Sequence, residues 1–316
     1  MHRGRAAITA AVTAVCTIAG TALPAAAART ATAAPAAGGI VSRLKHLPGV
    51  TYLGRNAYPP SGYTVYELEI RQPVNHSQPD GATFEQHLEL YERDLNAPMM
   101  MYVSGYFNYT YVSPKDTYLA PATAIVDGNQ ISVESRFFGD SVPHPTLWKY
   151  ATAWQEAADE HHVVQVFKSL YRARWLLSGV SKGGEAAIFH DYYYPHPLSA
   201  QNPEQDLPPG IPAGPLGQQL MRAVHQWVHQ HGNHLLFLYG QDDPWSAERF
   251  SVGSGARDSA IFTIAGGNHV SPYTDLPPAQ REVFVSTLRR WAGVSTAGSP
   301  AQAAASRLPL LSWGHV

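Results

Sequence analysis

A serine flanked by glycines is the first residue whose setting could support chemistry. Residues 179–183 spell G-x-S-x-G, with Ser181 at the centre and a further glycine at position 184. Such glycines permit a sharp turn in which the backbone passes close to neighbouring elements while the serine hydroxyl projects from the tip. An apolar stretch at 174–179 leads into the motif, and helical spacing follows it over 184–194. The motif therefore stands at the strand-to-helix junction that an exposed serine nucleophile needs.

A serine hydroxyl becomes an effective nucleophile only when a base lies within hydrogen-bond distance and a third group orients that base. His269, in a glycine-containing loop after an expected strand, is the predicted base. Asp242 and Asp243 follow the preceding expected strand, and the pattern alone does not choose between them as the orienting acid. The order Ser, Asp, His along the chain is the one found in α/β-hydrolases. The predicted chemistry is acyl transfer through a covalent serine intermediate.

Backbone N–H groups close to the serine are needed to stabilise the negative oxygen of the tetrahedral intermediate. The predicted donors are the N–H of Lys182, directly after the nucleophile, and one at Gly105 or Tyr106, in the loop after the expected strand 98–103. We expect the side chain of Lys182 to be structural, because adjacent residues on a sharp turn point apart. The sequence does not identify the residues that bind the substrate.

The elements expected to position these residues alternate between strand and helix. Period-two and continuous apolar stretches predict strands, and a 3.6-residue period predicts helices. The expected strands are 63–70, 84–91, 98–103, 131–138, 174–179, 235–239 and 260–265, and the expected helices are 154–171, 184–194, 218–231 and 278–291. The first two strands form an antiparallel hairpin. The order predicts one α/β domain with a mostly parallel central sheet and helices on both faces.

The two ends of the chain differ in composition from the middle. Residues 1–28 combine an arginine-containing start, an apolar run and a small-residue cleavage point at Ala25–Ala28, which predicts a signal peptide and a secreted, extracellular protein. Residues 29–39 predict a flexible leader, 40–292 the catalytic domain, and 293–316 a low-complexity tail.

Composition disfavours several classes of function. The 316-residue chain has 22 Lys+Arg against 24 Asp+Glu and a net charge of −2, so there is no basic excess for binding nucleic acid. The only cysteine, Cys16, lies in the predicted signal peptide, which leaves a mature chain without a disulfide or a thiolate ligand. His225 and His229 have the i, i+4 spacing of a metal-binding pair, with His231 and His234 nearby, but no Glu follows the first of them. We expect neither a metal nor a cofactor.

Together these motifs resemble the bacterial secreted tripeptidyl aminopeptidases, serine peptidases of the α/β-hydrolase superfamily. The resemblance runs from 45 to 292 apart from one gap, and its matching stretches are 72–76, 83–86, 104–106, 126–130, 136–138, 154–157, 179–184, 243–245 and 266–269. In that family the acid is the aspartate before Pro-Trp, which implies the triad Ser181, Asp243 and His269. The resemblance further implies an α/β-hydrolase fold and removal of tripeptides from free N-termini. The implied partners are peptide or protein substrates, with no stable membrane association after signal cleavage.

The gap in the resemblance lies at 195–217. Family members carry a strand after the elbow helix and then a helical lid, whereas this stretch has no apolar run able to form a buried strand. We therefore expect that strand to be missing and the lid to be reduced or absent. Its loss would force the outer neighbour to pair inward or leave buried backbone groups unpaired, at about 1 to 3 kcal/mol each. Two alternatives follow: an esterase-type acyl hydrolase with the same triad, and a catalytically impaired, truncated family member.

Overall fold

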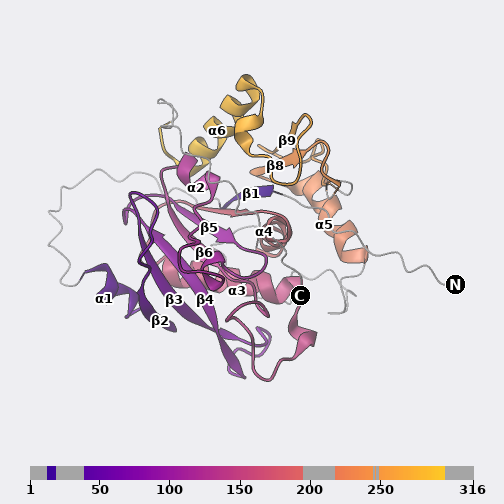
Figure 1. Cartoon of the computed structure of the whole chain (residues 1–316). Helices are drawn as coiled ribbons and strands as arrows, with labels where there is room; N and C mark the ends of the chain where they lie inside the picture. Colours follow the sequence, from indigo (N-terminus) through magenta and orange to yellow (C-terminus); the bar gives the residue numbers. More distant parts are fainter. Residues whose placement is uncertain (1–12, 19–38, 195–217, 245, 247–248, 296–316) are drawn as a thin grey trace, which may run out of the picture.

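The structure is a computed structural model that describes residues 13–18, 39–194, 218–244, 246 and 249–295. Within these residues the strands are β1 (Thr13–Ile18), β2 (Val50–Arg55), β3 (Thr64–Pro73), β4 (Thr83–Glu92), β5 (Met99–Val103), β6 (Asn129–Val133), β7 (Trp175–Gly179), β8 (Leu235–Gly240) and β9 (Ala260–Ile264). The α-helices are α1 (Ile40–Leu44), α2 (Pro121–Ile125), α3 (Ala153–Phe167), α4 (Lys182–Tyr193), α5 (Gln218–His231) and α6 (Pro278–Ala292). All strands join one sheet in the order β2-β3-β4-β6-β5-β7-β1-β8-β9 (Figure 1).

The direction of the strands confirms the predicted mostly parallel sheet. β5 pairs in parallel with both β6 and β7, and β8 pairs in parallel with β9. β7 and β8 are each antiparallel to β1, so all five strands run the same way. At the other end, β3 and β4 form the expected antiparallel hairpin, from Thr64 opposite Glu92 to Pro73 opposite Thr83. The fold is that of an α/β-hydrolase, as the sequence predicted.

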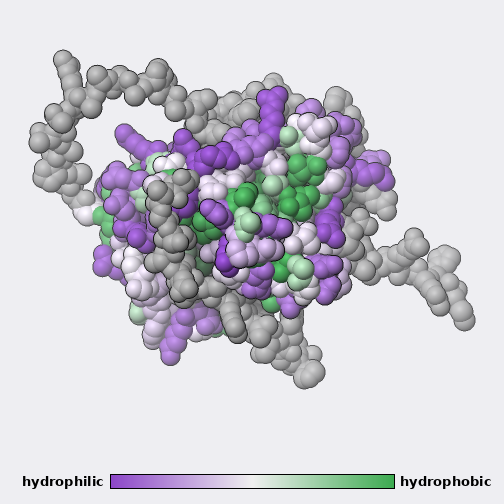
Figure 2. All heavy atoms as spheres, turned by 90° about the horizontal axis from the view of Figure 1, so that it is seen from above, coloured by the Kyte–Doolittle hydropathy of each residue, from purple (hydrophilic) through white to green (hydrophobic). Residues whose placement is uncertain are grey.

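Helices cover both faces of the sheet. One apolar core joins β5, β7, β8 and β9 to α2 and α6, and its large members include Leu176, Phe262 and Trp291. The other core joins the opposite face to α1, α3, α4 and α5. Figure 1 shows α2 and α6 together at the top of the molecule, and Figure 2 views the molecule from that side, where hydrophobic groups lie among polar ones. In the described part of the chain, no helix has the length and apolar character needed to cross a membrane.

The strand beside β7 differs from the expectation. The sequence predicted that the outer neighbour would pair inward or that backbone groups would be left unpaired. Instead, β1 lies between β7 and β8 and pairs with both. β1 comes from the segment predicted to be a signal peptide. The rest of that segment, the leader up to residue 38, the shortened stretch 195–217 and the tail from 296 lie outside the described residues.

Strand β6 is shorter than predicted. The sequence indicated a strand over 131–138, but β6 ends at Val133. The fully buried carboxylate of Glu134 accepts hydrogen bonds from the backbone N–H groups of Asn108, Asp140 and Ser141. These bonds turn the chain back on itself directly after the strand, so an apolar sequence does not continue as a strand.

Candidate active site

Ser181 occupies a strained turn between β7 and α4. Its φ of 58° and ψ of −129° lie in a region that non-glycine residues rarely adopt and that is typical of functional sites. A Cβ at Gly179 would overlap the carbonyl oxygen of Gly183, and a Cβ at Gly183 would overlap that of Val103. The glycines of the motif are therefore required by close backbone approaches, which is the physical reason for the G-x-S-x-G pattern.

The loop after β5 packs directly on this turn. Gly105 has a φ of 78°, and a Cβ there would overlap the backbone nitrogen of Gly183. The N–H of Lys182 is the first of α4, where no intrahelical acceptor is available. The carbonyl of Tyr106 is fixed by hydrogen bonds from the Ser104 hydroxyl at 2.7 Å and the Ser135 N–H at 2.9 Å. The structure thus brings together the two backbone segments that carry the predicted oxyanion donors Lys182, Gly105 and Tyr106.

His269 and Asp243 are hydrogen-bonded to each other. Nδ1 of His269 lies 3.0 Å from Oδ2 of Asp243, whose side chain is 4% exposed against 31% for the histidine. The hydroxyl of Ser246 donates to the same oxygen at 3.2 Å. An acceptor at Nδ1 favours the tautomer that carries its proton there, which leaves Nε2 able to accept a proton. Asp242, by contrast, is exposed, so the geometry pairs the histidine with Asp243.

The loops carrying these two residues are joined by backbone contacts. The N–H of Gln241 donates to the carbonyl of Ile264 at 2.9 Å, and that of Asp242 donates to Gly267 at 2.8 Å. Because β7, β8 and β9 run in the same direction, their carboxyl ends meet at one edge of the sheet. Ser181, Asp243 and His269 each follow one of these strands and therefore share that edge.

The side chain of Lys182 anchors the turn, as predicted. Its Nζ lies 3.1 and 3.2 Å from the two carboxylate oxygens of Glu156 on α3. The same ammonium lies over the rings of Phe138 and Tyr106, at 5.2 and 5.8 Å from their centroids. Glu156 could not be identified from the sequence, because its partner is distant in the chain and no motif links the two.

A short rim of aromatic rings flanks the turn. Tyr106 is 45% exposed and meets the edge of Phe138 at 5.3 Å between centroids. Phe137 stacks on Trp148 at 5.0 Å, and Trp148 is 67% exposed. Exposed rings held in place by other rings offer apolar contact area at little entropic cost.

Glu185, in the first turn of α4, is a titratable group beside the turn. Burial raises the pKa of its carboxyl to about 7, although the positive charge of Lys182 acts in the opposite direction. The position at the amino end of a helix also favours the charged form. Its charge therefore changes near neutral pH.

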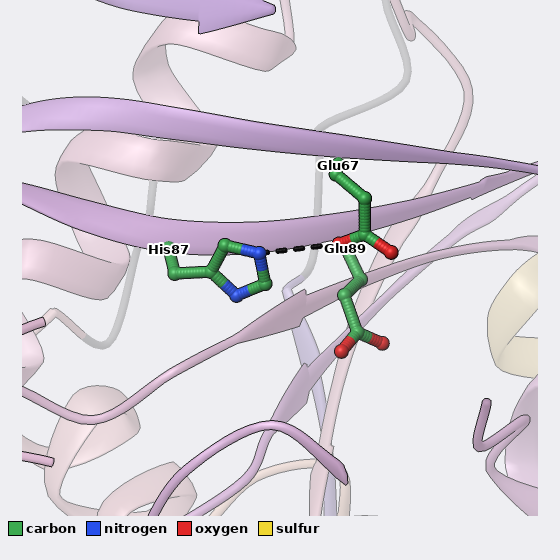
Figure 3. Close-up of side chains that lie close together, drawn as sticks. All are labelled: Glu67, His87 and Glu89. Carbon is green, nitrogen blue, oxygen red and sulfur yellow. Dashed lines mark hydrogen bonds and ion pairs between the residues drawn. The ribbon is translucent and has the colours of Figure 1, made fainter. Parts of the chain in front are cut away.

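One group of side chains in the described residues has the composition of a metal site: Glu67, His87 and Glu89, whose ligand atoms lie within 4.8 Å of one another (Figure 3). Each already has protein partners. Nε2 of His87 lies 3.1 Å from Glu67, and both oxygens of Glu89 accept hydroxyl hydrogen bonds, from Thr110 and from Tyr91. Burial raises the pKa of Glu89 to about 7, against the effect of those hydrogen bonds. These three side chains are therefore held by hydrogen bonds to protein groups, one of which, Thr110, lies in the loop that follows Tyr106. A metal ion would have to displace these bonds.

The histidines considered as a metal pair have separate partners in the structure. Nε2 of His225 lies 2.9 Å from the hydroxyl of Ser251, and the His234 ring lies against Trp291. The ring of His229 packs against the backbone at Gly253, where an added Cβ would overlap it. The described residues do not place these histidines around a common point.

Comparison with known proteins gives the following similarities. A family described as PS-10 peptidase S37 matches residues 33–201 and 198–313. A prolyl tri/tetrapeptidyl aminopeptidase of Streptomyces mobaraensis is 37% identical over 160 residues, which are 51% of this chain and 32% of the relative. The chain thus spans about a third of the length of that curated relative.

Two solved structures are also similar. An S-formylglutathione hydrolase from Agrobacterium tumefaciens is 15% identical, with a TM-score of 0.45, over 77% of this chain and 99% of the other. Acetyl xylan esterase 1 from Thermoanaerobacterium sp. JW/SL YS485 is 11% identical, with a TM-score of 0.43, over 79% of this chain and 92% of the other.

Proposed function

This chain belongs to the PS-10 peptidase S37 family, and on that premise we propose that it is a serine peptidase that cleaves peptide bonds near free N-termini through Ser181, His269 and Asp243. The observation that carries the proposal is the 3.0 Å hydrogen bond between His269 and the buried Asp243, at the sheet edge where Ser181 sits in its strained turn. The relative from Streptomyces mobaraensis, named as a prolyl tri/tetrapeptidyl aminopeptidase, supports the choice of substrate.

In the proposed mechanism, the hydroxyl oxygen of Ser181 attacks the scissile carbonyl while Nε2 of His269 takes its proton. Asp243 accepts the Nδ1–H bond, holds the tautomer and stabilises the imidazolium that forms. The backbone N–H groups of Lys182 and of Gly105 or Tyr106 stabilise the negative oxygen of the tetrahedral intermediate, an effect commonly worth about 10² to 10³ in kcat per donor.

Collapse of the intermediate breaks the C–N bond, and the imidazolium of His269 gives its proton to the leaving amine. The acyl group is left as an ester on Ser181. A water then attacks this ester, with His269 again as base, and the acid product leaves with regeneration of the serine hydroxyl. Each proton taken from an attacking group is thus returned to a leaving group.

We also propose that the strand and lid expected after α4 are missing and that the protein is exported from the cell. The family match falls into two stretches that meet at 198–201, inside the segment predicted to be shortened, which supports the absence of the intervening strand and lid. The composition of residues 1–28 supports export to an extracellular location. Recovery of the protein from culture medium tests the export, and its recovery only from cells would contradict it.

The experiment compares three substrate types on the purified protein: proline-containing tripeptide p-nitroanilides with a free amino terminus, the same peptides acetylated, and a short p-nitrophenyl ester. Ser181→Ala is the control. We expect the free peptides to be cleaved with the highest kcat/KM. Equal cleavage of the acetylated peptides would contradict an aminopeptidase, and turnover of the ester alone would favour the esterase alternative.

A further inference from the structure

Glu134, the residue directly after β6, is a buried acid that the proposed mechanism does not use. It is 0% exposed. Its own backbone is fixed to β4, because its N–H donates to the carbonyl of His87 at 3.2 Å and its carbonyl accepts a hydrogen bond from the side-chain amide of Gln86 at 2.8 Å. The carboxylate therefore extends from a fixed point of the central sheet.

The two oxygens of this carboxylate bind two different segments. Oε1 of Glu134 accepts the N–H of Asn108 at 3.0 Å. Oε2 accepts the N–H of Asp140 at 3.0 Å and, from Ser141, both the N–H at 3.1 Å and the hydroxyl at 2.7 Å. Hydrogen bonds to an ionised acceptor are stronger than those between neutral groups. One side chain thus joins the loop after β5 to the turn at 137–141.

The loop after β5 is tied to the end of β6 at alternate residues. The N–H of Ser104 donates to the carbonyl of Val133 at 3.1 Å, and the carbonyl of Tyr106 accepts the N–H of Ser135 at 2.9 Å. The carboxylate of Glu134 supplies the third bond, two residues further along the loop. None of these three bonds uses a predicted oxyanion donor. They therefore fix the segment that carries the donors without occupying the donors themselves.

The turn bound by the other oxygen is strained around the same carboxylate. Phe137 has a φ of 69°, which is rare for a bulky residue, and Gly139 has a φ of 51°. A Cβ at Gly139 would overlap Oε1 of Glu134. Such strain persists only where the surroundings fix it. The ring of Phe138, in this turn, meets the ring of Tyr106, so the two segments bound by the carboxylate also contact each other beside the elbow.

We propose that Glu134 is a positioning residue for the oxyanion hole. It touches neither substrate nor reacting atoms, and it acts through Asn108 by holding the N–H groups of Gly105 and Tyr106 where the negative oxygen forms. Donors stabilise that oxygen only when they are correctly placed, and a displacement of about 1 Å can lower the rate by about 10². The inference rests on the proposed function, because it concerns the rate of the same reaction.

Glu134→Gln tests this role, because glutamine has the same size but only one accepting oxygen. Three of the four donors face the Oε2 position, so the amide oxygen should take that side and the NH₂ group should oppose the N–H of Asn108. On the substrate that the parent cleaves fastest, we expect kcat to fall by about 10² and KM to change by less than about twofold.

Ser141→Ala is the matched control. It removes a hydroxyl that donates to Glu134 and accepts the backbone N–H of His87 at 2.9 Å, but it leaves the bond to Asn108 in place. Its melting temperature should fall while kcat stays within about twofold of the parent value. Equal losses of kcat in Ser141→Ala and Glu134→Gln would show a merely structural role. That result, or a parent-like kcat in Glu134→Gln, would overturn the inference.

A second pair of variants tests the same bond from the loop. Asn108 has a φ of −69°, which proline adopts, so Asn108→Pro removes the N–H at a compatible backbone angle, whereas Asn108→Ala keeps it. Asn108→Pro should lower kcat more than Asn108→Ala does. Combining it with Glu134→Gln should add little further loss, because both changes break one bond. Losses that multiply in the double variant would contradict the proposed route through Asn108.

Hydrogen exchange of the peptide covering residues 104–108 separates this inference from the proposed function, because it needs no substrate. Exchange should be at least about tenfold faster in Glu134→Gln than in the parent and little changed in Ser141→Ala. Parent-like exchange in Glu134→Gln would overturn the inference. A parent that hydrolyses no substrate, together with the expected exchange pattern, would contradict the proposed function while the hold of Glu134 on the loop stands.

Discussion

Glu185 links the stability of this fold to pH near neutrality. Its carboxyl has a pKa of about 7 in the folded protein, because of burial, against 4.5 for a free glutamate. Between these values the folded protein holds a proton that the unfolded chain has released. The contribution of the group to stability is therefore fully present below pH 4.5 and is lost as the pH rises through 7.

The size of this effect follows from the same two values. One pKa unit corresponds to about 1.4 kcal/mol, and the side chain is only partly buried, so ionised Glu185 destabilises the fold by about 1 to 3 kcal/mol. Glu185→Gln has nearly the same shape and no charge. We expect its free energy of unfolding to exceed that of the parent by this amount at pH 8.5 and to equal it at pH 4.5.

The measurement is urea unfolding followed by tryptophan fluorescence at a series of pH values from 4.5 to 8.5. Comparison of variant with parent at each pH removes the effect of other titrating groups, such as Glu89. Glu282→Gln, at an exposed position on α6, is the matched control and should show no pH-dependent difference. A stability difference for Glu185→Gln that does not change with pH, or that is larger at pH 4.5, would refute the reasoning.

Two further predictions concern the proposed catalytic geometry. Asp243→Asn should lower kcat by about 10⁴ with the fold intact, because the neutral amide no longer holds the required tautomer of His269. Asp242→Asn, at an exposed position, should change kcat little. Equal losses of kcat in the two variants would contradict the assignment of Asp243 as the acid. Gly183→Ala should lower kcat/KM by about 10², because the added methyl group overlaps the Val103 carbonyl and must displace the turn by about 1 Å. Gly54→Ala, with open space around it, is the control and should be neutral. Normal kinetics for Gly183→Ala would show that the turn tolerates this displacement.

The regular elements around the site could be predicted from the sequence because their residues alternate or repeat. β3 and β4 show a clear period of two, and α6 begins at Pro278, the second of two adjacent prolines, and carries a helical apolar face. β2 was not predicted, because Gly54 and Arg55 interrupt its apolar pattern and every second residue is exposed. α2 is a five-residue helix, too short for a periodic signal.

The sequence did not predict the strand β1, for a physical reason. Its apolar run near the N-terminus carries the pattern of a signal peptide, and a run of six residues has no periodicity that would indicate a strand. What makes it a strand is the presence of two unpaired edges elsewhere in the fold. That demand is non-local and does not show in the segment itself.

The candidate site likewise contains some residues that local motifs indicate and others that only the structure identifies. Local motifs indicate Ser181 and His269 as candidates, and the family resemblance implies Asp243. Pattern alone left Asp242 and Asp243 open, since adjacent residues in a turn share the same sequence context. Burial and the bond to the histidine separate them in the structure. Glu134, which fixes the loop after β5, was not predicted because its partner Asn108 lies 26 residues earlier, in a different loop.

The proposed function requires Ser181 to be an activated nucleophile. The most direct measurement is labelling of the purified full chain with a fluorophosphonate, followed by mass mapping of the adduct, with Ser181→Ala as control. We expect one adduct per chain, located at Ser181 and absent from the variant. A folded protein that is not labelled, or that is labelled equally in the variant, would contradict it.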